Sequence, residues 1–228
     1  QRSLVGSEMC IRDRVTALQT ATRGNGINIV LLGDAFSDRL VADGTYDGTM
    51  RKAMEHFFSE EPYKSFRDLF NVYAVNVVSK NEAYGSGAQT ALDGFFGDGT
   101  HVGGNDDKCR QYAMKVPGIT DDNIDDALII VMMNRTYYAG TCYMYYPSSG
   151  DYGQGLSIAY FPLGTDDGMF GQLLHHEAGG HGFPKLADEY AYEEYGQIPW
   201  NEVQSAKQLE PYLSLIHISE PTRLRCIS

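Results

Sequence analysis

The stretch "MFGQLLHHEAGGHGF" at residues 169–183 decides the fold class, because it places three histidines and a glutamate within seven residues. Its first half has apolar residues at helical spacing, and either Asp166 or Asp167 stands where a side chain caps the first turn. A core helix with incidental histidines would share this apolar pattern. The whole chain has only six histidines, so their crowding here favours a metal-binding helix.

The spacing of these histidines is unusual for such a helix. Zinc-binding helices commonly carry His-Glu-x-x-His, in which histidines four apart project from one face. Here His176 and His181 are five apart, which separates them by about 140° on an ideal α-helix. One wide turn with i→i+5 bonding would return both rings to one side, and Gly179 and Gly180 carry no side chains to oppose it. We therefore predict that His176 and His181 share a metal ion, and that His175 faces away as a packed or hydrogen-bonded residue.

Outward from this stretch, apolar runs alternate with helical patterns, which predicts a mixed α/β domain. Continuous apolar runs predict buried strands, and amphipathic patterns predict helices. The predicted strands are residues 27–34, 69–78, 127–134 and 156–162, and the predicted helices are 46–66 and 107–115. Strands followed by a histidine-bearing helix are typical of an α/β (α+β) zincin-like domain with a mixed sheet and an active-site helix. The run "LSIAYFP" at 156–162 is either an edge strand that could pair with an extended peptide or an ordinary interior strand.

The two ends of the chain fit nothing between them. Leu215 to Arg223, back-translated with permitted codons and reverse-complemented, encodes Leu4 to Ile11 in another frame. One inverted DNA segment explains both peptides, and it resembles the transposon-end adapter of sequencing libraries. We therefore expect residues 1–14 and 213–228 to be adapter-derived, and residues 15–212 to be part of one domain, truncated at its C-terminus, from a longer gene.

Charge and composition exclude several partners. The formal net charge is −12, and it becomes more negative when both ends are left out. A nucleic acid or an anionic membrane surface is therefore not the expected partner. No apolar run reaches the roughly 18 residues of a membrane span. Between the two ends only Cys109 and Cys142 remain, and they are either one disulfide or two buried thiols.

Three further patterns in the sequence are weaker signals of function. Gly33-Asp34 after an apolar strand is similar to the start of a Gly-Asp-Ser esterase, but Ala35 occupies the nucleophile position and only Ser37 follows nearby. The tyrosine-rich segment 135–155 is read as a packed loop. The acidic segments 97–108 and 120–128 lack the spacing of a calcium loop and are read as solvated loops.

The motifs together resemble a known family. Three stretches, "INIVLLGDAFS" (27–37), "EPYKSFRDLFNVYAV" (61–75) and "HEAGGHGFPKLADEY" (176–190), resemble in sequence and in order the immunoglobulin-A peptidase family of zinc metallopeptidases, in its gut-bacterial branch. The resemblance covers about residues 27–195. It implies a zinc-dependent endopeptidase that is secreted, periplasmic or at the cell surface and acts on a protein or peptide substrate.

The resemblance also implies a role for each site residue. His176 and His181 would bind Zn²⁺, and Glu177 would be the general base for a metal-activated water. The third ligand would come from the acidic pair in "LADEY", with Asp188 preferred to Glu189. Two other functions stay open: a catalytically inactive surface binding module of the same fold, and a zinc amidohydrolase acting on a non-peptide amide.

Overall fold

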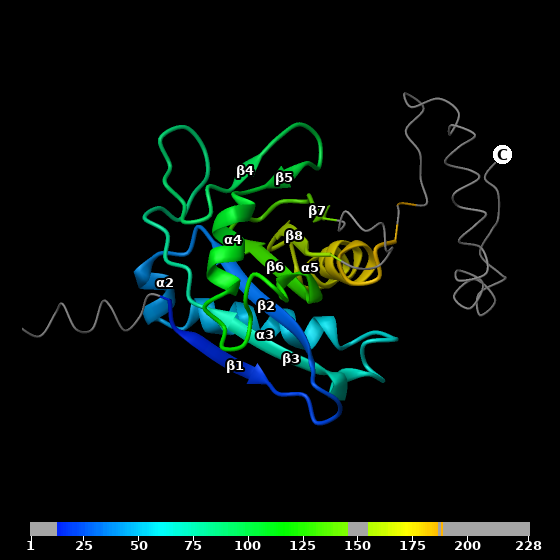
Figure 1. The fold of residues 1–228 in the computed structure, drawn as a ribbon. Helices are drawn as coiled ribbons and strands as arrows, with labels where there is room; N and C mark the ends of the chain where they lie inside the picture. The colour runs from blue at the N-terminus through cyan, green and yellow to red at the C-terminus, as the bar shows by residue number, and fades with distance from the viewer. Residues whose placement is uncertain (1–12, 146–154, 187, 189–228) are drawn as a thin grey trace, which may run out of the picture. The chain divides into compact units, whose positions relative to one another are not determined.

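A mixed β-sheet organises the chain in the computed structural model, which describes residues 13–145, 155–186 and 188. The sheet has six strands in the order β1-β3-β2-β6-β8-β7 (Figure 1). The strands are β1 Val15–Gln19, β2 Ile27–Asp34, β3 Phe70–Val75, β6 Ala127–Met133, β7 Thr141–Met144 and β8 Ser157–Pro162. The four central strands β3, β2, β6 and β8 are parallel, whereas β1 and β7 pair antiparallel at the two margins. A separate two-stranded sheet joins β4 Phe95–Phe96 to β5 Val102–Gly103.

Helices cover both faces of the large sheet. The α-helices are α2 Asp38–Ala42, α3 Thr45–Phe57, α4 Asp106–Ala113 and α5 Asp167–Leu174, with short 3-10 helices η1 Arg67–Leu69 and η2 Ile124–Asp126. Buried side chains of α2, α3 and α5 pack on one face of the sheet, and those of α4 pack on the other. None of the helices in the described ranges is long and apolar enough to cross a membrane.

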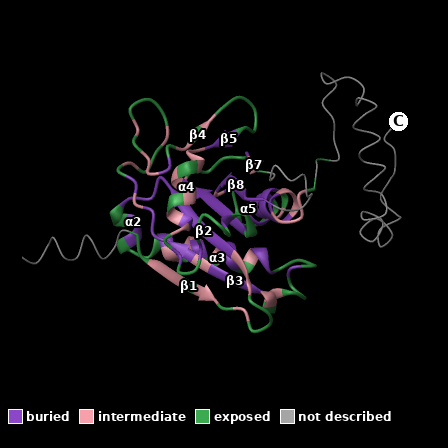
Figure 2. Cartoon of the chain, viewed as in Figure 1, coloured by how far each residue is buried: buried purple, intermediate pink, exposed green. Residues whose placement is uncertain are grey.

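The central strands are buried on both faces, which explains why they read as continuous apolar runs. In β2, Ile29 and Leu31 point into the core beneath α3 and α5, whereas Val30 and Leu32 point into the core beneath α4. Each of the four is at most 1% exposed. Figure 2 shows most of β2 in the colour of buried residues. The α/β fold class predicted from these runs is confirmed.

Strand β8 is interior, so of the two alternatives for residues 156–162 the ordinary interior strand is confirmed and the edge strand is wrong. It lies between β6 and β7 in the sheet. The strand at that margin is β7, which lies in the tyrosine-rich segment 135–155, so the prediction of a packed loop is wrong for Thr141–Met144. Its four residues are all of intermediate burial, so they form neither an apolar run nor a clear alternation.

Several sequence predictions fall outside the described residues. These are the end segments 1–14 and 213–228, of which only Asp13 and Arg14 are described, and Glu189, the alternative third ligand.

Both cysteines of the central segment, Cys109 and Cys142, are free thiols. They belong to the packing on opposite faces of the sheet, so the alternative of two thiols is confirmed, with Cys109 buried and Cys142 only partly buried.

Candidate metal centre

The histidine-bearing helix begins as predicted and then widens. The Asp166 side chain accepts a hydrogen bond from Met169 N at 2.9 Å, so Asp166 rather than Asp167 caps α5. After Leu174 the backbone passes into a π-helix, η3 His175–Gly182. At the end of η3, the next residue, Phe183, donates from its N to Ala178 O at 2.9 Å, five residues back. The predicted i→i+5 turn is confirmed, and the wide geometry extends over all eight residues of η3.

The two glycines of η3 differ in what surrounds them. A side chain at Gly179 would bring its Cβ to 3.2 Å from the Tyr63 ring, which is closer than most such contacts. A Cβ at Gly180 would find only His175 O, at 3.6 Å. The Tyr63 hydroxyl donates a hydrogen bond to Gly179 O, and the Tyr63 ring packs against Phe57 and Phe183. Tyr63 therefore ties the wide helix to the aromatic core beside α3.

The wide helix brings His176 and His181 together. Their Nε2 atoms are 3.3 Å apart and their ring centroids 4.7 Å apart. His181 Nδ1 lies 2.7 Å from the Leu186 carbonyl oxygen. Because a carbonyl only accepts hydrogen bonds, Nδ1 carries the proton, and the neutral ring then offers its Nε2 lone pair to a ligand.

Asp188 joins the two histidines. One ligand atom from each of His176, His181 and Asp188 lies within 4.8 Å of the others. Across the described ranges, no other trio of His, Cys, Asp or Glu side chains has its ligand atoms gathered in this way. The acidic loop residues of 97–108 and 120–128 form no such group.

Glu177 lies beside the pair but in a different environment. It is 4% exposed, whereas His176 is exposed, and Glu177 Oε1 is 3.9 Å from His176 Nε2. The Glu177 carboxylate also affects the nearby Cys142 thiol. Burial raises the pKa of Cys142 to about 12, and the negative charge of Glu177 contributes to the increase. Glu177 is thus a buried carboxylate next to an exposed imidazole.

His175 takes no part in this cluster. Its Nε2 atom lies 3.3 Å from Ser59 Oγ, just beyond the end of α3. Burial lowers the pKa of His175 below its usual value. This agrees with the prediction of a packed, hydrogen-bonded histidine.

A comparison with protein families identifies the chain. The model of the family described as IgA peptidase M64 matches residues 15–222, most of the sequence. The chain belongs to the IgA peptidase M64 family. A comparison with curated proteins found no match. Membership in the IgA peptidase M64 family assigns the chain to the metallopeptidases, so its three-ligand group lies in a domain whose family hydrolyses proteins or peptides.

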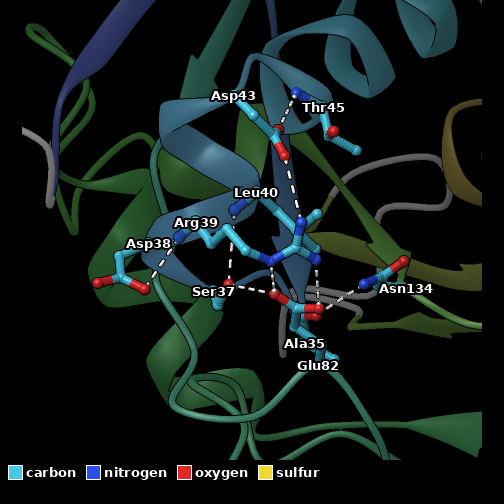
Figure 3. Close-up of polar contacts among 9 residues, drawn as sticks. All are labelled: Ala35, Ser37, Asp38, Arg39, Leu40, Asp43, Thr45, Glu82 and Asn134. Carbon is cyan, nitrogen blue, oxygen red and sulfur yellow. Dashed lines mark hydrogen bonds and ion pairs between the residues drawn. The ribbon is translucent and has the colours of Figure 1, made fainter.

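The esterase-like Gly33-Asp34 segment has a structural role. Ser37 Oγ accepts from Leu40 N as the N-cap of α2 and donates to Glu82 Oε1 (Figure 3). Glu82 in turn binds the Arg39 guanidinium, with Oε2 2.8 Å from Nη2. The Ser37 hydroxyl therefore caps a helix within an ion-pair network.

Sequence reasoning missed one residue of the site, Gly140. It directly precedes β7, and a Cβ there would lie 2.1 Å from Glu177 Oε1. No sequence signal marks this contact, because it depends on a strand that the apolar pattern did not reveal.

Proposed function

We propose that the chain is a zinc-dependent endopeptidase in which His176, His181 and Asp188 hold the metal and Glu177 is the general base. The observation that carries the proposal is the 3.3 Å separation of the two Nε2 atoms beside a buried glutamate. Within the metallopeptidase assignment, the zinc, the residue roles and the mechanism are our proposal.

The donor set fits zinc. Two nitrogen ligands at about 2.0–2.1 Å from one tetrahedral ion lie about 3.3–3.4 Å apart, and the Nε2 atoms are already separated by 3.3 Å. Two imidazoles and one carboxylate are three protein ligands, the number typical of catalytic zinc sites that keep one position open. The hydrogen bond from His181 Nδ1 to Leu186 O is the outer contact expected of a zinc-binding histidine.

Each protein group has a distinct task in the proposed mechanism. When bound, zinc would lower the pKa of a water molecule towards about 7 and polarise the scissile carbonyl. Glu177 would accept the proton of the attacking water at Oε1, the oxygen on the His176 side, and pass it to the leaving amine. Burial of Glu177 limits competition from bulk water for this carboxylate.

Glu177→Gln tests the proposal with the full chain. We expect the variant to keep about one zinc ion per chain and to hydrolyse fluorescein-labelled casein roughly 10²–10⁴-fold more slowly. The matched control is Glu55→Gln, because Glu55 is an exposed residue of α3 that forms an ion pair with Arg67. Undiminished hydrolysis by Glu177→Gln would refute the general-base role. A wild-type chain that binds no zinc would instead favour the inactive binding module.

A further inference from the structure

The Glu177 side chain occupies the space that a side chain at Gly140 would need. A Cβ atom at this position would lie 2.1 Å from Glu177 Oε1, 2.6 Å from Cδ and 2.7 Å from Cγ. Real Cβ contacts essentially never fall under 3.0 Å. The three nearest atoms all belong to Glu177, so no other side chain accounts for the missing methyl group as directly.

Backbone conformation does not explain this glycine. The φ angle of Gly140 lies outside the left-handed region that favours glycine, so an alanine could adopt the same backbone. The space occupied by the Glu177 carboxylate is therefore what excludes a side chain.

The backbone on either side of Gly140 is fixed. Gly140 N donates to Thr100 O at 3.1 Å, and the preceding Ala139 is 1% exposed. The following Thr141 pairs with Tyr160 in the sheet, and its Oγ1 accepts from Val102 N at 3.1 Å. A methyl group at residue 140 would therefore displace the Glu177 carboxylate rather than the strand.

We propose that Gly140 is a positioning residue for Glu177. The absence of a side chain lets the carboxylate lie against the backbone that leads into β7, with the same oxygen, Oε1, facing Gly140 and standing 3.9 Å from His176 Nε2. This inference rests on the proposed function, in which Oε1 handles the proton of the attacking water. Displacement of the carboxylate leaves the three metal ligands in place and removes the base from its position.

The first test compares Gly140→Ala with wild type in steady-state hydrolysis of a quenched-fluorescence peptide. We expect kcat to fall roughly 10²-fold with KM changed less than about threefold, because a displaced base affects proton transfer more than substrate binding. Zinc content should remain about one ion per chain. Gly48→Ala is the matched control: Gly48 is exposed in α3 with nothing within 4 Å of its Cβ position, and we expect wild-type kinetics.

A double-mutant cycle on thermal stability tests the contact without relying on catalysis. Gly140→Ala should lower the Tm in the wild-type background and have little effect in a Glu177→Ala background, where the obstructing carboxylate is gone. An equal loss of Tm in both backgrounds overturns the proposal. So does a wild-type kcat for Gly140→Ala when Glu177→Gln is inactive. Should Glu177→Gln prove active, the proposed function fails, and the Tm cycle still decides whether Gly140 sets the position of Glu177.

Discussion

His176 Nε2 and His181 Nε2 lie 3.3 Å apart although five sequence positions separate the two residues. On an ideal α-helix this spacing would place the rings about 140° apart. The π-helix η3 brings both rings to one side, so the proposed metal site depends on the stability of η3. Isolated π-helical turns are rare and depend on tertiary contacts, of which the hydrogen bond from Tyr63 to Gly179 O is the most direct.

Tyr63→Phe should destabilise the chain by about 1–3 kcal/mol, since it leaves the Gly179 carbonyl buried without the Tyr63 hydroxyl. The ring and its aromatic contacts remain, so the loss reports the hydrogen bond. Urea unfolding measures it, with Tyr138→Phe as the control because Tyr138 is 59% exposed. We also expect weaker zinc binding by Tyr63→Phe, as the wide turn loses its anchor. Equal stability of both variants would show that η3 does not need this contact.

The parts of the fold that sequence could predict are those governed by local pattern. Strands β2 and β6 are buried on both faces and therefore read as unbroken apolar runs. The wide turn could be predicted from local geometry alone, because histidines five residues apart can share one metal ion only if the helix widens between them.

The parts that could not be predicted depend on contacts between distant segments. β7 is half-buried throughout, so its four residues carry no periodic signal, and without β7 the interior place of β8 cannot be deduced. The contact between Gly140 and Glu177 exists only once β7 lies beside η3. The sequence favoured Asp188 without excluding Glu189, because adjacent carboxylates have the same local pattern.

Alanine substitution separates the two acidic residues. In the proposed site Asp188 is a zinc ligand, so we expect Asp188→Ala to weaken zinc binding by more than about 100-fold. Glu189→Ala should cost no more than about 10–100-fold, the range typical of residues that orient a ligand. Competition with a chelator of known zinc affinity measures both. The reverse order would make Glu189 the third ligand and contradict the grouping of Asp188 with His176 and His181.

Ser37→Ala should cost about 1 kcal/mol of folding stability and leave casein hydrolysis unchanged. The hydroxyl caps α2 and donates to Glu82, so its loss exposes an unpaired helix terminus. Thermal denaturation and the casein assay measure the two effects. If Ser37 were a nucleophile, the Ser37→Ala variant would lose its activity. That outcome would support the esterase hypothesis drawn from Gly33-Asp34.

The two thiols of the folded domain should resist modification. Burial raises the pKa of Cys109 and of Cys142 from 9.0 to about 12. A raised thiol pKa means less thiolate at any pH below it, so at pH 8 the fraction of each thiol present as thiolate falls roughly 10³-fold relative to the unfolded chain.

A variant with Cys10→Ser and Cys226→Ser isolates these two thiols. Its reaction with a chromogenic disulfide reagent should be slow when folded and rapid in guanidinium chloride, with two thiols counted. Rapid modification of the folded chain would contradict the burial of these cysteines, and a count of zero in the unfolded chain would reveal a disulfide between them.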